Sequence, residues 1–291
     1  MKQVSDWLQS FRSEDILEAL IPSSKTNTAL PKRTAALHKA RTVSITGGKG
    51  GVGKTSVAIK TARELAELGF KVLLIDCDYN LANTAIKLNL PLNDAFYSLL
   101  SAEKTLEECL YSEGNFHLLS GCNGSLELFE NKLPLDQVIM DIMGSHEHEY
   151  DYMLLDCPAG LSKETLTLNA YCDERFFIVT PDKSSITDSY SLMKVLATKY
   201  GVKENHLIIN MYSSEEQFNR VVNSIVSTAE NYLGVRTQIL GGIKKLEVKV
   251  DSFDDHFLRK KSSVNHEDFL KVIKRYAEKR EVTQHDVGSI N

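Results

Sequence analysis

A glycine-rich stretch near the start of the chain holds the residues best suited to chemistry. Gly48-x-x-x-x-Gly53-Lys54-Thr55 follows the apolar run TVSIT and opens a segment of helical periodicity. In such a loop, consecutive backbone N–H groups and a helix N-terminus form a fixed site for phosphate oxygens. The lysine reaches the β- and γ-phosphates, and the hydroxyl that follows it binds Mg²⁺. We therefore expect a nucleoside triphosphate site with Lys54 and Thr55 in these roles.

The rest of the loop decides how closely a phosphate group can approach. Gly50, Gly51 and Gly53 carry no Cβ, so the backbone can meet phosphate oxygens without a steric clash. The expected nucleotide-binding residues form one run: Gly48, Lys49, Gly50, Gly51, Val52, Gly53, Lys54, Thr55 and Ser56.

Lys49 is one cation more than the phosphate-binding template needs. Because Lys54 already serves the phosphates, a lysine at the front of the loop is expected to point away from its own nucleotide. It could then donate positive charge to the γ-phosphate held by a second copy of the chain, as an arginine finger does. The alternative is that Lys49 is simply solvated. The first interpretation predicts a homodimer that closes around ATP.

Carboxylates at two predicted strand ends are candidates to hold the metal. Asp156 ends the apolar run YMLLD. Asp76 and Asp78 lie two residues apart at the end of VLLIDCD, so an extended strand turns both side chains to the same side. A magnesium ion at a phosphate site needs such a carboxylate at the carboxyl end of a strand. The alternative for each acid is simple solvation at the sheet edge.

The apolar pattern supplies the strands and helices that must position these residues. Nearly continuous apolar strands separated by helices are typical of a parallel sheet with both faces covered. The expected strands are 42–46, 71–76, 116–120, 152–156, 175–180, 206–210 and 237–240, and the clearest helices between them are 54–68, 184–200 and 214–232. The predicted fold class is α/β: a P-loop NTPase with a mostly parallel central sheet, helices on both faces and an N-terminal helical extension.

The chain divides into an arm, a linker, one large domain and a tail. Residues 1–21 include a helical apolar pattern that Pro22 ends, and they are either a packing arm or a partner-binding peptide. Residues 22–41 contain prolines and no acid, which is typical of a linker. The nucleotide-binding domain is expected over 42–280, and the tail over 281–291.

Bulk composition narrows the setting of the chain. The net charge of −5 gives no general attraction to nucleic acid, which is therefore not an expected partner. No apolar run is long enough to span a membrane, and the N-terminus lacks the apolar core of a signal peptide. Five cysteines without CxxC spacing favour reduced thiols. We expect a cytoplasmic protein.

Four segments together resemble the MinD/ParA family of ATPases over about residues 40–280. KGGVGKTS resembles its deviant Walker A motif, in which the early lysine, here Lys49, is the signature residue. LLIDCDYNLANT and LLDCPAGLS are similar to the two switch segments of the family. IVTPDKSSITDSYSLMKVL is similar to a segment typical of its FlhG branch (also called FleN or YlxH), the flagellar number regulators.

The resemblance implies an ATPase whose cofactors are ATP or ADP and Mg²⁺. In that family Lys49 reaches across an ATP-bound homodimer, and Asp78 orients the attacking water. Asp76 and Asp156 support the metal together with Thr55. The implied catalytic residues are therefore Lys49, Asp78 and Asp156, with slow, partner-stimulated turnover.

One part of the nucleotide site departs from the family pattern. LIINM is similar to the strand whose asparagine, here Asn210, contacts adenine. After ILGGI, however, Lys244 and Lys245 stand where the family usually has a proline and an aspartate near the base.

The resemblance also suggests partners at both ends of the chain. DWLQSFR keeps Asp6, Phe11 and Arg12 of the segment through which FlhG proteins stimulate a signal-recognition-type GTPase, FlhF. Residues 266–280 place four apolar side chains at i, i+3, i+4 and i+7, namely Phe269, Val272, Ile273 and Tyr276. This pattern fits the amphipathic membrane-targeting helix of the family, with peripheral attachment to the inner face of the membrane or the cell pole. It fits equally a last helix packed on the sheet.

The implied function is an ATP-dependent switch that controls the placement or number of flagella through membrane and partner binding. Two alternatives stay open: a ParA-like ATPase that partitions DNA or other cargo, and an ATP-gated scaffold that does not hydrolyse ATP.

Overall fold

The computed structural model of the chain describes residues 39–78, 83–92, 94–101, 103–121, 134–247, 254–259 and 266–276. The predicted arm (1–21), most of the linker (22–41) and the tail (281–291) lie outside the described residues. The predicted strands and helices of the nucleotide-binding domain fall largely within them, so the α/β architecture can be compared element by element.

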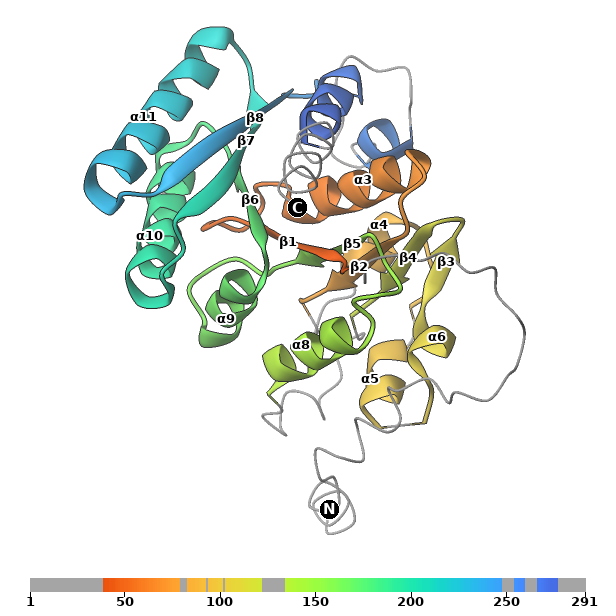
Figure 1. Ribbon diagram of the computed structural model, residues 1–291. Coiled ribbons are helices and arrows are strands. Elements are labelled where there is room, and N and C mark those ends of the chain that lie inside the picture. Colours follow the sequence, from red (N-terminus) through yellow and green to blue (C-terminus); the bar gives the residue numbers. More distant parts are fainter. Residues whose placement is uncertain are drawn as a thin grey trace, which may run out of the picture.

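The strands that the structure describes form one sheet in the order β3-β4-β2-β5-β1-β6-β7-β8. Neighbouring strands are parallel throughout, except for the antiparallel pair β3 and β4. The strands are β1 (Arg41–Thr46), β2 (Val72–Asp76), β3 (Tyr111–Glu113), β4 (Phe116–Leu119), β5 (Tyr152–Asp156), β6 (Glu174–Val179), β7 (Glu204–Tyr212) and β8 (Arg236–Lys244). β1 lies between β5 and β6, so the loop after β1 leaves from the middle of the sheet (Figure 1).

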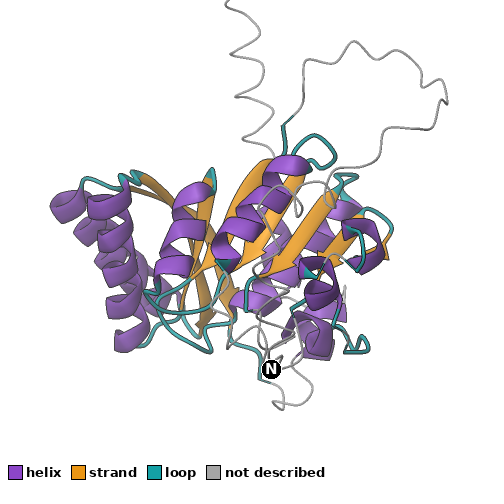
Figure 2. Ribbon diagram, turned by 90° about the horizontal axis from the view of Figure 1, so that it is seen from below, coloured by secondary structure: helices purple, strands orange, loops and turns teal. Residues whose placement is uncertain are grey.

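Helices cover both faces of the twisted sheet, as predicted (Figure 2). They are α3 (Lys54–Glu67), α4 (Asn83–Lys87), α5 (Ala95–Leu100), α6 (Leu106–Cys109), α8 (Leu135–Ser145), α9 (Lys163–Tyr171), α10 (Lys183–Tyr200) and α11 (Glu215–Leu233), followed by the π-helical turn η2 (Asp255–Arg259) and a helix over residues 266–276. α3, η2 and the last helix pack on one face, and α5, α8, α10 and α11 pack on the other.

The alternation of side chains along each strand divides the core between these two faces. On β2, Val72 and Leu74 pack in the cluster that contains α3, whereas Leu73 and Ile75 pack with α5 and α8. All four side chains are fully buried. Strands buried on both faces read as continuous apolar runs, which is why the sequence predicts them well.

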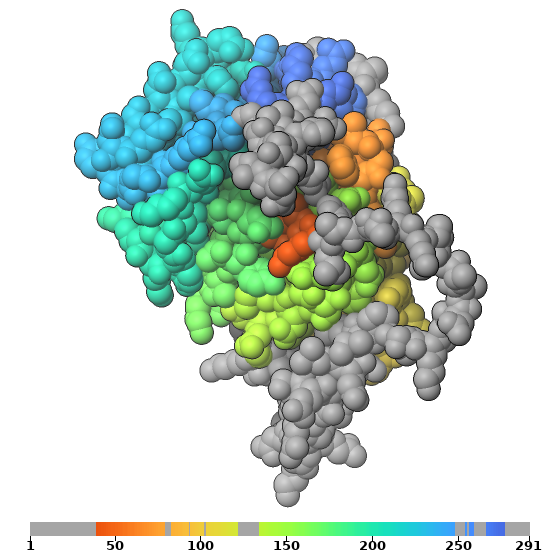
Figure 3. Space-filling view, viewed as in Figure 1, coloured from red at the N-terminus to blue at the C-terminus, as the bar shows by residue number. Residues whose placement is uncertain are grey.

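The helix over residues 266–276 packs its apolar stripe against the sheet. Phe269, Val272, Ile273 and Tyr276 are buried in the same cluster as the apolar residues of α3. The approach is close, because a Cβ added at Gly241 of β8 would lie 2.8 Å from Cγ2 of Val272. In the space-filling view this helix, in blue, lies beside the orange surface of α3 (Figure 3). Of the two interpretations of this pattern, the structure shows the packed helix, and membrane attachment stays a prediction.

No helix in the described part of the chain combines the length and the apolar character that crossing a bilayer requires. The four cysteines among these residues, Cys77, Cys109, Cys157 and Cys172, are buried and free of disulfides.

Core packing of the last helix predicts a large effect of truncating its stripe. Ile273→Ala should lower the free energy of unfolding by about 2–5 kcal/mol, because it deletes fully buried methyl groups. Urea unfolding measures this change. The matched control is Lys274→Ala on the exposed side of the same helix, which should stay within about 0.5 kcal/mol of the wild type. Equal, small effects of both variants would contradict the packing.

Candidate functional site

The glycine loop connects the end of β1 to the first turn of α3 in the middle of the sheet. Gly51 and Gly53 have φ angles of 77° and 94°, in the left-handed region that favours glycine. A Cβ at Gly53 would lie 2.5 Å from Nδ2 of Asn210, so this position also needs glycine for space. A Cβ at Gly50 or Gly51 would meet nothing within 4 Å, which means that the backbone there faces open space. The loop thus presents bare backbone to a ligand.

The front of the loop is packed against α10. A Cβ at Gly48 would lie 2.1 Å from the carbonyl carbon of Asp188, and the N–H of Gly48 donates a 3.4 Å hydrogen bond to Oγ of Ser189. The N–H of Thr180 donates to Oγ of Ser185 at 3.0 Å. The small hydroxyl residues of the SSITDSY segment therefore let this helix approach the loop closely.

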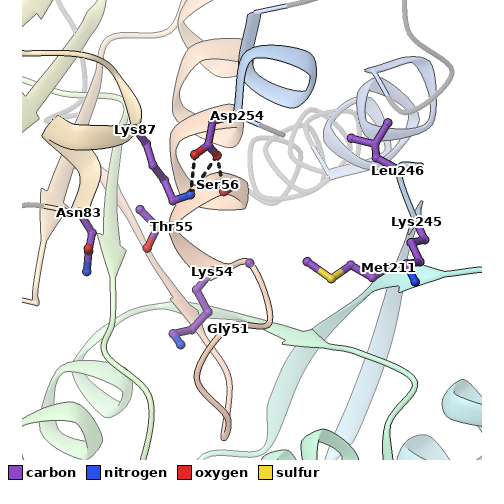
Figure 4. Close-up of a pocket in the computed structure, with 11 residues that line it drawn as sticks. Gly51, Lys54, Thr55, Ser56, Asn83, Lys87, Met211, Lys245, Leu246 and Asp254 are labelled. Carbon is purple, nitrogen blue, oxygen red and sulfur yellow. Dashed lines mark hydrogen bonds and ion pairs between the residues drawn. The ribbon is translucent and has the colours of Figure 1, made fainter. Parts of the chain in front are cut away.

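A cavity of about 550 Å³ opens beside the loop (Figure 4). Its residues come from three directions: the loop and first turn of α3, the helix α4, and the end of β7 with the chain that follows β8. They are Gly51, Gly53, Lys54, Thr55, Ser56, Asn83, Lys87, Met211, Lys245, Leu246 and Asp254. Lys54 and Thr55 lie at one end and Met211 and Lys245 at another, so the cavity is long enough to hold an extended ligand along the loop.

Lys54 is the buried cation of this site. Its ammonium lies 3.4 Å from the carbonyl oxygen of Lys49, across the loop. Burial lowers the pKa of Lys54, and the nearby carboxylate of Asp156 opposes that shift. A cation in this position stabilises negative charge delivered to the loop.

Asp76 and Asp156 lie side by side, because parallel β2 and β5 pair them in register. The whole residues are 0% and 3% exposed. Burial raises the pKa of Asp156 to about 8, and the charge of Asp76 adds to the shift. Burial also raises the pKa of Asp76 to about 6, although hydrogen bonds to its carboxylate oppose this. Two buried carboxylates on paired residues of neighbouring strands need a cation nearby if both are to stay ionised.

The hydrogen bonds of Asp76 connect β2 to the helix that follows it. One carboxylate oxygen accepts from Oγ1 of Thr84 at 2.7 Å and from its N–H at 3.2 Å, while the other accepts from the N–H of Asp78 at 3.1 Å. Asp78 in turn accepts from Nδ2 of Asn83 at 3.3 Å. Burial raises the pKa of Asp78, and Lys54 opposes the shift. Asp78 therefore lies close enough to Lys54 and Asp156 to interact with both charges.

These residues fit a magnesium ion that is shared with phosphate. Oδ1 of Asp156 is buried without a hydrogen-bond partner, and the Thr55 hydroxyl bonds to the same carboxylate. In the described parts of the chain, no group of three or more His, Cys, Asp or Glu could hold a metal on its own. Mg²⁺ usually keeps several waters and binds one or two carboxylates together with substrate phosphates. Thr55 and Asp156 would hold the ion, with Asp76 beside them.

Lys49 lies outside the lining of this cavity. Its ammonium pairs with Oδ1 of Asp182 at 2.8 Å, and both side chains are more than 40% exposed. The two residues line a neighbouring cavity of about 390 Å³, which shares Gly51, Met211 and Lys245 with the first. Asp182 also caps α10 by accepting from the N–H of Ser185 at 2.9 Å. Although burial opposes it, the hydrogen bonds from Lys49 and its neighbours hold the pKa of Asp182 well below its usual range.

Comparison with known proteins places this arrangement in a family. A sequence profile described as an AAA domain matches residues 40–198, which is more than half of the chain. The antiactivator FleN of Pseudomonas aeruginosa is 25% identical over 240 residues, covering 80% of this chain and 86% of FleN. The flagellum site-determining protein YlxH of Helicobacter pylori is 30% identical over 205 residues, covering 66% of this chain and 68% of YlxH. The chain belongs to the MinD/ParA family of ATPases. Within it, the chain is similar to the FlhG branch.

Solved structures confirm the fold of this MinD/ParA-family ATPase. MinD of Pyrococcus horikoshii, complexed with Mg-ADP, superposes with a TM-score of 0.67 at 23% identity and covers 81% of this chain and 96% of that one. MinD in the MinC:MinD complex of Aquifex aeolicus gives a TM-score of 0.62 at 24% identity, over 82% of this chain and 96% of that one.

Asn210 braces the loop of this ATPase. Its Nδ2 donates to the carbonyl oxygen of Val52 at 2.8 Å, and its Oδ1 accepts from the N–H of Met211 at 3.0 Å. It does not line the cavity, whereas Met211, Lys245 and Leu246 do. The adenine contact of Asn210 stays a prediction.

Three charged residues at the site are not among those that the sequence predicts. Asp182 has a local signal, since an aspartate before a helical run is a typical N-cap. Lys87 and Asp254 have none, because they meet across 167 positions of the chain.

The buried carboxylate pair predicts a conflict between function and stability. The pKa of Asp156 lies near 8 in the folded chain and near 4 in the unfolded chain. The loss of folding stability that its ionisation causes is therefore absent below about pH 4, grows up to about pH 8 and then levels off. Without Mg²⁺ and nucleotide, Asp156→Asn should therefore be more stable than the wild type at pH 8. Urea unfolding should show a free energy of unfolding that is higher by on the order of 2 kcal/mol.

The gain of Asp156→Asn should shrink at pH 5, where the wild-type carboxyl is largely protonated. Adding Mg²⁺ and ADP should stabilise the wild type more than the variant. A variant that is less stable than the wild type at pH 8 would contradict the conclusion that the buried charge of Asp156 destabilises the folded chain.

Proposed function

We propose that this chain is an FlhG-type switch, in which ATP closes two copies into a homodimer and hydrolysis releases them. Its output would be control of the placement or number of flagella through partner and membrane binding. The observation that carries the proposal is the place of Lys49. This lysine lies outside the lining of the phosphate cavity, which contains Lys54, and its exposed side chain pairs with Asp182.

The roles of the other residues follow from the geometry around the loop. Bound Mg²⁺ and ATP would supply the phosphoryl chemistry, with Lys54 and Thr55 at the phosphates and Asp156 at the metal. Asp76 would support the metal and hold the start of α4 through Thr84. Asp78 would orient the attacking water, a role that asks for position more than for basicity. The Mg-ADP held by the Pyrococcus MinD supports this choice of cofactors.

Reaching a second copy requires Lys49 to leave Asp182. An exposed ion pair of this kind contributes only about 0–1 kcal/mol, so its loss opposes the exchange weakly. A γ-phosphate that has been removed from water would compete strongly with the carboxylate. The ion pair with Asp182 thus positions Lys49 on its own chain but is weak enough to be exchanged for a γ-phosphate.

The relatives support the flagellar output, since one is named an antiactivator and the other a flagellum site-determining protein. We further propose that residues 1–20 contact an FlhF-like GTPase. Deleting them should abolish stimulation of that GTPase, and unchanged stimulation would remove this partner. Attachment to the inner face of the membrane would require a nucleotide-dependent change at the last helix, whose stripe is buried. Equal liposome pelleting with ADP and with a non-hydrolysable ATP analogue would exclude it.

Light scattering after size exclusion tests the dimer. With ATP, Asp78→Ala should run as a stable dimer because hydrolysis is blocked, and the wild type should return to a monomer as ATP is consumed. Lys49→Ala should lose turnover by at least about 10³-fold, the magnitude typical of a finger residue. The matched control is Lys183→Ala, an exposed lysine next to Asp182, which should behave as the wild type.

A protomer that remains single with bound ATP at every concentration would refute the switch. A gel shift of DNA that requires ATP and disappears with added salt would instead favour a ParA-like ATPase that partitions DNA.

A further inference from the structure

Three segments that are distant in sequence meet at one carboxylate beside the phosphate cavity. Nζ of Lys87 lies 2.9 Å from both oxygens of Asp254, and Oγ of Ser56 donates to Oδ1 of Asp254 at 3.3 Å (Figure 4). Lys87 ends α4, Asp254 directly precedes η2, and Ser56 lies in the first turn of α3. The ion pair therefore joins α4 to the C-terminal segment next to the loop.

The position of this cluster relates it to the nucleotide. All three residues line the cavity, and Ser56 follows directly after Thr55 on its wall. The loop assigns the β- and γ-phosphates to Lys54, while Met211 and Lys245 line the end away from it. Ser56 lies on the wall between these two ends, where the α-phosphate of a bound nucleotide would pass.

The charges decide which of the three residues can accept a phosphate. The side chains of Lys87 and Asp254 are only 27% and 35% exposed, so water screens them incompletely. A carboxylate would repel a phosphate oxygen at this place, whereas the ammonium and the hydroxyl would donate to it. Asp254 and an α-phosphate therefore compete for the same two donors.

We infer that Lys87 is an α-phosphate ligand and that Asp254 is the counter-ion that holds it when no nucleotide is bound. On binding, Lys87 and Ser56 exchange the carboxylate for the phosphate. The inference rests on nucleotide binding at the loop and does not depend on the proposed dimer. Lys87 is a positioning residue for the nucleotide, supplied by the helix that Asp76 holds in place through Thr84.

Opposite effects of the two partners on ADP affinity test this exchange. Calorimetric titration of the full chain with Mg-ADP should show about 10-fold weaker binding for Lys87→Met, since a charge-assisted hydrogen bond is lost, and near-normal binding for Lys87→Arg. Asp254→Asn should bind ADP about 3-fold more tightly, because a competing charge is removed. The matched control is Glu113→Gln, which breaks the ion pair between Glu113 of β3 and Arg63 of α3, outside this cavity, and should leave the affinity unchanged.

Phosphorothioate analogues locate the contact on the α-phosphate. The two diastereomers of ADPαS place sulfur, a poor hydrogen-bond acceptor, at one or the other α-oxygen. The wild type should prefer one diastereomer by several-fold, and Lys87→Met should lose much of that preference.

Two results would overturn the inference: a preference that Lys87→Met leaves unchanged, or weaker ADP binding in both Lys87→Met and Asp254→Asn, as a purely structural ion pair predicts. Because ADP is not expected to form the dimer, failure here would leave the proposed switch untouched, and loss of the switch would leave this result standing.

Discussion

The parallel register of β2 and β5 brings Asp76 and Asp156 together in the buried centre of the sheet, where neither carboxylate can be hydrated. Removing two like charges from water costs several kcal/mol per ion unless a cation compensates them. Lys54 supplies one positive charge from the loop, and it is itself buried. Without a bound cation, Asp156 therefore keeps its proton up to about pH 8, and Mg²⁺ bound with a nucleotide would favour the ionised pair. Ligand binding and folding stability thus depend on the same two groups.

The same pair connects the phosphate loop to the parts of the chain that surround it. Asp76 accepts three hydrogen bonds from Asp78 and Thr84, so its charge bears directly on how firmly α4 is held. α4 carries Lys87 to the cavity, and Lys87 in turn holds Asp254 of the C-terminal segment. Hydrogen bonds, the helix α4 and an ion pair thus connect the end of β2 to the residue that precedes η2.

The sequence predicts most of this framework and little of its cross-connections. Buried parallel strands are continuous apolar runs, so β1, β2, β5 and β6 fall within about one residue of their predicted bounds. β7 and β8 extend beyond the predicted runs because the pairing continues past them, through Gly241 and Gly242 in β8. The apolar stripe of residues 266–276 shows the limit of pattern analysis. The same periodicity fits a membrane-binding helix and a helix packed on the sheet, and in the structure Phe269 and Ile273 pack on the sheet.

The two lysines of the loop differ in the one property that the sequence does not show, which is their burial. Lys54 is enclosed and faces carboxylates on neighbouring strands, so moving it would leave those charges unpaired. Lys49 is exposed and paired with a single carboxylate, and this exposed ion pair opposes movement of the lysine only weakly. A buried cation fits the role expected of Lys54 at the phosphates, whereas an exchangeable one fits the role that the proposed dimer asks of Lys49. The proposed switch thus depends on one lysine of each kind in the same loop.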